Sequence, residues 1–106
     1  MNDLLTRVKV ATYDELEPQI GQPVQINDHR IALFKVTSGE IYAVEDKSPH
    51  PKGGVLSEGL VSGHYVFCPV YDWKISLTDG LVQAPDEGKV QTYKVEVLDG
   101  EVYVNL

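Results

Sequence analysis

The sequence predicts an all-β protein built as an antiparallel sandwich or small barrel. Short segments rich in Val, Ile and Tyr recur along the chain, and such side chains suit a pleated, half-buried surface. Turn-forming dipeptides separate them, at Asn27-Asp28, Ser38-Gly39, Ser62-Gly63, Asp79-Gly80 and Asp99-Gly100. Short strands at this spacing are typical of sandwiches and barrels.

The strands are expected in short segments before and after one long irregular stretch. They cover residues 7–10, 24–26, 30–36, 41–44, 65–68 and 74–76. The clearest strands form a final hairpin, in which apolar residues alternate with others over 93–97 and again over 102–104. Asp99-Gly100 lies between them and favours the positive φ angles of a tight hairpin turn.

One short helical turn is expected after the first strand. Thr12 and Glu15 have the spacing of a capping box, in which each side chain satisfies a backbone N–H group at the helix start. Pro18 then ends the helix, because proline does not continue a helical hydrogen-bond ladder. The helix is therefore predicted to span about one turn.

The segment from residue 45 to residue 59 departs from the strand pattern. It has little strand character and contains Pro49, Pro51, Gly53, Gly54 and Gly59. A loop of this length in a compact domain is usually functional or derived from a functional one. We therefore expect the candidate site to include this loop.

Composition excludes several classes of function. A chain of 106 residues is expected to form a single domain, residues 1–106, with one hydrophobic core. Nine basic and sixteen acidic residues give a net charge of −7, and no basic cluster offsets it, so we expect no binding to nucleic acid. The longest apolar runs, such as Ile31 to Phe34, are too short to span a membrane. The first seven residues have no basic region followed by an apolar stretch, so we expect no secretory signal.

The cysteine count limits the possible metal sites. Cys68 is the only cysteine, so an internal disulfide, a four-cysteine zinc site and a four-cysteine iron–sulfur cluster are impossible within one chain. A zinc ion held by His50, His64 and Cys68 would need a fourth ligand. A lone cysteine also suits the reducing cytoplasm, which is the expected location.

Two segments carry the most informative motif. The first reads S-P-H-P-K-G-G-V-L-S-E-G from Ser48 to Gly59, and the second reads V-F-C-P-V-Y-D-W from Val66 to Trp73. They resemble the two cluster-binding loops of Rieske [2Fe–2S] domains, which read C-x-H and C-x-x-H and bind one iron through two cysteines and the other through two histidines. The resemblance extends over nearly the whole chain.

The resemblance implies a Rieske-like fold. In that fold a small two-loop sub-domain, about residues 46–76 here, is inserted into a larger antiparallel β framework. At the four ligand positions His50 and Cys68 match the family, whereas Ser48 replaces a cysteine and Tyr71 replaces a histidine. Pro51 is an extra residue relative to the common form of the first loop.

These departures predict that the chain binds no cofactor or metal. Each iron would lose one of its two protein ligands, and the hydroxyl of Ser48 is a hard oxygen donor that is poor beside a thiolate. Tyrosinate does ligate iron in some proteins, but the side chain of Tyr71 is longer than the imidazole that the loop accommodates. The alternative is a Rieske-type [2Fe–2S] ferredoxin-like electron carrier with unusual ligands.

Two further runs, Ser57 to Gly63 and Cys68 to Ile75, are similar to the small subunits of assimilatory NAD(P)H-dependent nitrite reductases. That resemblance implies a large partner subunit that carries FAD, a [4Fe–4S] cluster and sirohaem and reduces nitrite to ammonium. The small subunit would stabilise or position the large one, and the isolated chain would be inactive. A Rieske-like binding module of another oxidoreductase or an oxygenase is a third possibility.

The residues expected to contact a partner lie at the loop tips. They are His50, Pro51, Lys52 and Tyr71, because binding surfaces are usually carried on loops over a rigid scaffold. The hairpin turn at Asp99-Gly100 is the competing surface. We expect no catalytic residue: Ser48 and His50 are two positions apart, but no acid that would orient the histidine is identifiable.

Overall fold

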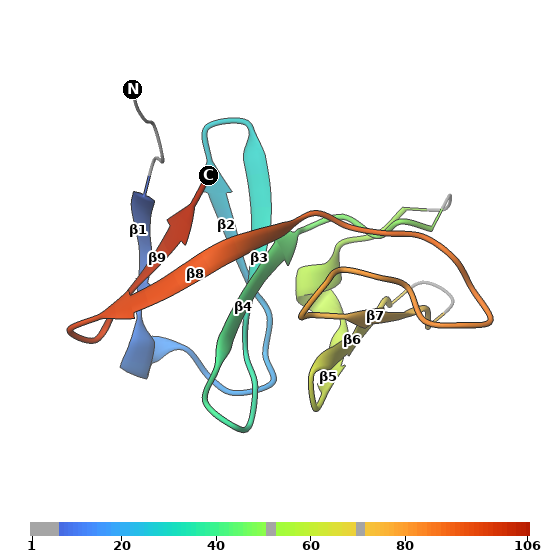
Figure 1. The fold of residues 1–106 in the computed structure, drawn as a ribbon, viewed down its shortest axis with the longest axis horizontal. Coiled ribbons are helices and arrows are strands. Elements are labelled where there is room, and N and C mark those ends of the chain that lie inside the picture. Colours follow the sequence, from blue (N-terminus) through green and yellow to red (C-terminus); the bar gives the residue numbers. More distant parts are fainter. Residues whose placement is uncertain (1–6, 51–52, 70–71) are drawn as a thin grey trace.

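The structure, a computed structural model, describes residues 7–50, 53–69 and 72–106. These residues form two β-sheets and two short turns of 3-10 helix, η1 (Tyr13–Glu15) and η2 (Leu56–Glu58) (Figure 1). The larger sheet has the spatial order β1 (Arg7–Thr12), β9 (Glu101–Asn105), β8 (Thr92–Leu98), β4 (Ile41–Glu45), β3 (His29–Lys35) and β2 (Gln22–Ile26). The small sheet has the order β5 (Leu60–Ser62), β6 (Tyr65–Phe67) and β7 (Lys74–Ser76).

Neighbouring strands pair antiparallel throughout both sheets. The predicted all-β antiparallel fold class is therefore confirmed. None of the helices in the described ranges has the length and apolar character that a bilayer span requires.

Strand β3 is buried on both faces. Ile31 and Leu33 join one buried cluster, whereas Ala32 and Phe34 join another, because successive side chains of a strand point to opposite faces. All four are at most 1% exposed. The unbroken apolar run in the sequence is the pattern that a strand covered on both faces produces.

The six-stranded sheet curls until its two edges share one core. A buried cluster contains Ile26 of the edge strand β2 and Val104 of β9. Val8 and Val10 of the opposite edge strand β1 pack against the same cluster. Because side chains from both edges meet, the sheet approaches a closed barrel.

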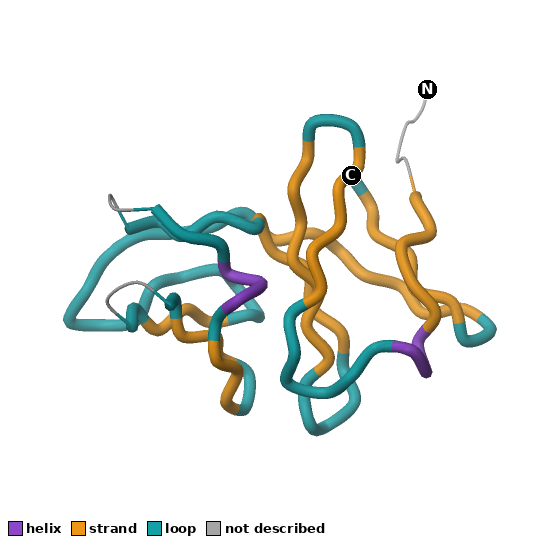
Figure 2. Tube along the Cα trace, turned by 180° about the vertical axis from the view of Figure 1, so that it is seen from behind, coloured by secondary structure: helices purple, strands orange, loops and turns teal. Residues whose placement is uncertain are grey.

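A second cluster joins the two sheets. It combines Phe34 of β3 and Val44 of β4 with Leu56 of η2, Val66 of β6 and Ile75 of β7. The small sheet and the long loops lie together beside the large sheet (Figures 1 and 2). Apolar packing therefore holds the half of the molecule that carries the predicted site.

The small half continues beyond β7. Ser76 N donates to Leu81 O at 2.9 Å, and Gln83 N donates to Lys74 O at 2.8 Å. A bridge between Ile75 and Val82 extends this pairing. The segment after Ser76 thus covers the outer edge of β7.

The strand predictions agree with the structure to within two residues at each end. The exceptions are β5 and η2, which the sequence does not predict. The hairpin turn is confirmed, with positive φ angles of 52° at Asp99 and 79° at Gly100.

The predicted capping box is wrong. The helical turn η1 begins after Thr12, but the Thr12 side chain makes no capping hydrogen bond. Thr12 is still part of β1 and pairs with Glu101 of β9, so its backbone is extended and committed to the sheet. The turn ends before Pro18, as expected.

Candidate functional site

The two loops of the motif are each closed by backbone hydrogen bonds. In the first loop, Ser48 N donates to Gly54 O at 2.9 Å, and Gly53 N donates to His50 O at 2.9 Å. In the second loop, Cys68 N donates to Trp73 O at 2.8 Å. Gly53 and Gly54 have φ angles of 83° and 110°, which favour glycine and explain the Gly-Gly pair.

Ser48 and Cys68 lie in direct contact between the two loops. The Cys68 thiol donates to Ser48 Oγ at 2.8 Å, and His50 N donates to the same oxygen at 3.1 Å. The two side chains are buried, with Cys68 0% and Ser48 2% exposed. The contact therefore links the loops through a hydrogen bond that water does not reach.

His50 packs on Trp73, which belongs to the other loop. Their ring centroids are 4.7 Å apart and the rings are inclined by 73°, an edge-to-face arrangement. Trp73 is half-buried and also packs against the core that joins the sheets. The aromatic pair is a second link between the loops.

Three of the predicted residues, Pro51, Lys52 and Tyr71, lie outside the described residues. The structure brings together the other three, Ser48, His50 and Cys68. The expected partner patch is therefore described only at His50.

Asp46, which no motif in the sequence singles out, closes the base of the first loop. Its carboxylate accepts hydrogen bonds from Ser57 N at 2.8 Å and from Ser57 Oγ at 2.9 Å. Asp46 is 3% exposed, and its own N–H donates to Arg30 O at 2.8 Å. The sequence feature that could have indicated this contact is an acidic residue directly after a buried strand, with a serine at the far end of the loop.

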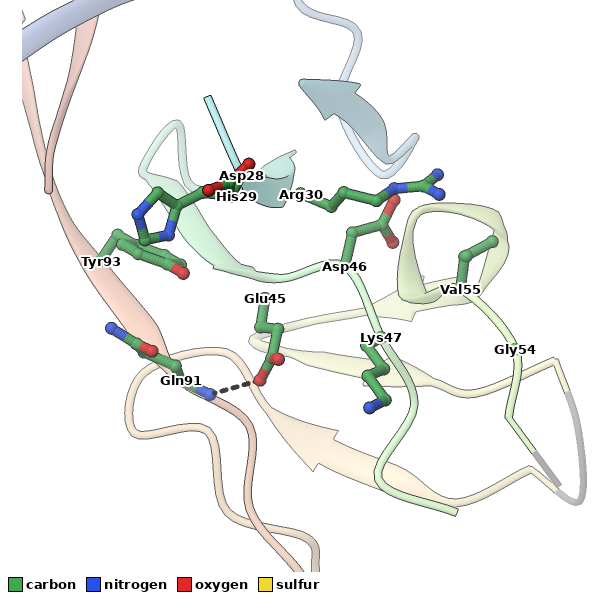
Figure 3. A pocket seen from close by; sticks show the side chains of 10 residues that line it. All are labelled: Asp28, His29, Arg30, Glu45, Asp46, Lys47, Gly54, Val55, Gln91 and Tyr93. Carbon is green, nitrogen blue, oxygen red and sulfur yellow. Dashed lines mark hydrogen bonds between the residues drawn. The ribbon is translucent and has the colours of Figure 1, made fainter. Parts of the chain in front are cut away.

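A pocket of about 420 Å³ lies beside this closure, where the two halves of the molecule meet (Figure 3). Charged and polar side chains line it, among them Arg30, Glu45, Lys47 and Tyr93. Burial raises the pKa of the Tyr93 phenol, and the negative charge of Glu45 raises it further. Tyr93 therefore keeps its proton at neutral pH and presents a hydrogen-bond donor.

A second hollow of about 500 Å³ also borders the first loop. It is lined by Ser48 and His50 together with Lys47, Lys89 and Glu45. Two lysines beside one carboxylate make this a locally positive surface on a chain of net charge −7. Such a surface attracts carboxylates and other anions.

The family described as Rieske-like [2Fe–2S] domain matches residues 6–105. The chain belongs to this family. The resemblance to this family and the predicted Rieske-like fold are thereby confirmed.

Relatives of this Rieske-like domain include nitrite reductase proteins. The NADH nitrite reductase small subunit of Escherichia coli is 28% identical over 88% of this chain and 91% of its own length. A crystal structure titled as a candidate NADPH nitrite reductase small subunit is 36% identical, with a TM-score of 0.81, and covers 94% of this chain and 98% of its own. The NAD(P)H nitrite reductase large subunit of Klebsiella oxytoca is 29% identical over 90% of this chain, which corresponds to 10% of that protein.

The described residues of this Rieske-like domain do not fit a [2Fe–2S] cluster. A tetrahedral metal bound to a sulfur at about 2.3 Å and an oxygen at about 2.0 Å separates those ligand atoms by about 3.5 Å. Cys68 Sγ and Ser48 Oγ are only 2.8 Å apart, and the thiol donates its proton to the oxygen. Ser48 supplies no second thiolate for a soft cluster.

The zinc alternative also lacks a ligand set. His64 lies elsewhere, with Nε2 3.4 Å from Glu40 Oε1 and its ring 5.8 Å from that of Tyr42. Among the described residues no three His, Cys, Asp or Glu side chains are grouped to hold a metal ion.

Proposed function

We propose that this chain is the small subunit of a cytoplasmic NAD(P)H-dependent nitrite reductase. The observation that carries the proposal is the occurrence of related domains in two forms. One is a separate small subunit of nearly the same length, and the other is about a tenth of a large nitrite reductase subunit. A domain that is found both beside a large subunit and within one is expected to dock on that subunit in a fixed place.

The subunit is proposed to carry no cluster and to have no catalytic residue of its own. The buried hydrogen bond between Cys68 and Ser48 supports this role, because it joins two residues that the resemblance assigns to cluster-ligand positions. FAD, a [4Fe–4S] cluster and sirohaem would belong to the large subunit. The small subunit would stabilise or position that subunit while nitrite is reduced to ammonium.

The proposed partner patch is formed by His50, Pro51, Lys52 and Tyr71 at the loop tips. The positive hollow lined by Lys47 and Lys89 borders His50 and supports this choice. A carboxylate-bearing surface on the large subunit would complement it.

Co-expression with the large subunit from the same genome tests the function. The two chains should co-purify, and the pair should oxidise NAD(P)H in a nitrite-dependent reaction that the isolated small chain does not support. The isolated chain should be colourless. Two irons and two sulfides per chain with Rieske-like visible bands would instead identify an electron carrier and overturn the cofactor-free role.

A paired substitution tests the patch separately. Lys52→Glu combined with Tyr71→Ala should weaken co-purification, whereas Asp99→Lys in the competing hairpin should leave it unchanged. The opposite result would assign docking to the hairpin.

A further inference from the structure

The small sheet has an outer face that the hydrophobic core does not use. Strand pairing aligns Leu60 of β5 with Phe67 of β6 and Lys74 of β7. Tyr65 lies two residues before Phe67 on β6 and therefore on the same face of the sheet. We call Leu60, Tyr65, Phe67 and Lys74 the outer face. The alternate residues Val61, Val66 and Ile75 point the other way, into the buried cluster that joins the sheets.

This outer face is unusually apolar for an exposed surface. Leu60 is 73% exposed, which is the highest value among the exposed large hydrophobic residues of the described chain. Phe67 and Tyr65 are only half-buried. Exposed clusters of leucine and aromatic side chains mark contact surfaces, because their removal from water stabilises a complex.

Lys74 gives the outer face a positive charge without a matching carboxylate. Its ammonium lies 4.3 Å from the centre of the Tyr65 ring and 5.9 Å from that of Phe67. Among the described residues no acidic side chain forms an ion pair with Lys74, although the chain carries sixteen acidic residues. The aromatic rings hold the ammonium in place and leave it available to an external carboxylate.

The row of Leu60, Phe67 and Lys74 lies at the end of the small sheet from which the second loop leaves. Cys68 follows Phe67 directly, and Trp73 precedes Lys74 (Figure 1 shows β5 to β7 below the loops). The outer face therefore ends next to Trp73, whose ring contacts that of His50, the described residue of the proposed partner patch. The outer edge of β7 is covered by residues 81–83, so the open side of the sheet is that of β5.

We propose that the outer face is a second part of the docking surface for the large nitrite reductase subunit. The matching surface would be apolar and would carry a carboxylate that pairs with Lys74. This inference rests on the proposed function, because it takes the large subunit as the partner. It adds a contact that the sequence motif of the two loops does not indicate.

Binding of purified variants to the purified large subunit tests the proposal. Leu60→Asp and Lys74→Glu should each raise the dissociation constant at least tenfold, and Lys74→Arg should stay within about threefold of the wild type. The loss caused by Lys74→Glu should shrink as salt is raised, since salt screens ionic contacts.

Matched controls lie on the large sheet. Leu98 lies beside the β8–β9 turn and is 43% exposed, so Leu98→Asp introduces the same charge at another exposed leucine. Lys94 is exposed on β8, and Lys94→Glu makes the same charge reversal there. Both controls should bind like the wild type. Unchanged far-ultraviolet circular dichroism and melting temperature would show that the variants fold.

The outcomes separate this proposal from the one it rests on. If the wild type does not bind the large subunit, the proposed function fails. If the wild type binds and the outer-face variants bind equally well, only the outer face is excluded. If the wild type forms a dimer that Leu60→Asp abolishes, a second copy of this chain occupies the face and the proposal is overturned.

Discussion

Ser48 and Cys68, which the resemblance assigns to two cluster-ligand positions, join the two loops by a hydrogen bond. The bond is buried, so its loss would leave polar atoms without partners, which costs more than the roughly 1 kcal/mol that a typical hydrogen bond contributes. His50 adds a second hydrogen bond to the same oxygen and an aromatic contact with Trp73. We expect these contacts to hold the loops closed in the proposed cofactor-free protein.

Restoring the missing ligands should restore the metal site. The double variant Ser48→Cys, Tyr71→His would present two thiolates and two imidazoles, which is the Rieske ligand set. After anaerobic reconstitution with iron and sulfide, we expect Rieske-like visible bands from the double variant and none from either single variant. Deletion of Pro51 in the same background tests whether the extra residue displaces His50. Visible bands from the reconstituted wild type would show that Ser48 and Tyr71 are working ligands.

Asp46 should be the most sensitive polar residue of the first loop. Asp46→Ala removes a buried carboxylate that accepts two hydrogen bonds from half-buried Ser57, and it should lower the free energy of unfolding by about 3 kcal/mol. Ser57→Ala removes only the hydroxyl contact and should cost about 1 kcal/mol. Urea denaturation measures both. Equal effects of the two variants would show that the backbone contact at Ser57 N does not contribute.

The difference between these residues shows what the sequence could predict about the site. Ser48, His50 and Cys68 stand in a recognisable spacing, so their meeting in space follows from the family pattern. The contact between Asp46 and Ser57 depends on how an eleven-residue separation folds back on itself, and local sequence does not determine that distance. The 2.8 Å separation of Ser48 and Cys68 likewise depends on the packing of two separate loops.

Among the elements, β3 was predictable and β5 was not. The apolar run of β3 has the length of a buried strand and lies between the turn dipeptides Asn27-Asp28 and Ser38-Gly39. Leu60–Ser62 is a three-residue segment between Gly59 and Gly63, and it becomes a strand because it pairs with β6. Tertiary pairing of this kind overrides weak local propensity. Thr12 illustrates the reverse case, in which a local helix signal yields to pairing in the sheet.

The approach of the segment before β2 to η2 requires a glycine. A Cβ atom at Gly21 would lie 2.4 Å from Ser57 O and 2.8 Å from the Phe34 ring. Gly21→Ala should therefore force the two halves apart and lower the free energy of unfolding by about 2–3 kcal/mol, as overpacking does.

Gly63→Ala is the matched control. Gly63 has a φ of 57° but nothing within 4 Å of an added Cβ atom, so only backbone strain of about 1 kcal/mol is expected. Thermal or urea denaturation compares the two variants. If Gly63→Ala lowers the free energy of unfolding more than Gly21→Ala does, the segment before β2 can move away from η2 at little cost.

At the scale of the whole molecule, one hydrophobic cluster spans both halves. Phe34 and Val44 of the large sheet share it with Val66 and Ile75 of the small sheet. A small sheet of three-residue strands has little stability alone, since isolated short strands need a hydrophobic face packed on something else. The cluster supplies that face.

We therefore expect the two halves to unfold together. Trp73 is the only tryptophan and reports on the loops, whereas far-ultraviolet circular dichroism reports mainly on the larger sheet. The two probes should give coincident transitions, as two-state unfolding requires. Val66→Ala in the small sheet and Val104→Ala in the large sheet remove the same groups from fully buried sites and should each cost about 2 kcal/mol.

In both variants the two transitions should shift by the same amount. If Val66→Ala lowers the Trp73 transition and leaves the circular dichroism transition in place, the small half unfolds independently.

A strong chelator of iron and zinc tests whether a metal holds the two halves together. A metal that binds only the folded chain stabilises it, so its removal would lower the melting temperature. We expect the two transitions to remain coincident and unchanged when the chelator is added. The two halves would then be held together by the shared hydrophobic cluster and by the contacts of Ser48, Cys68 and Trp73.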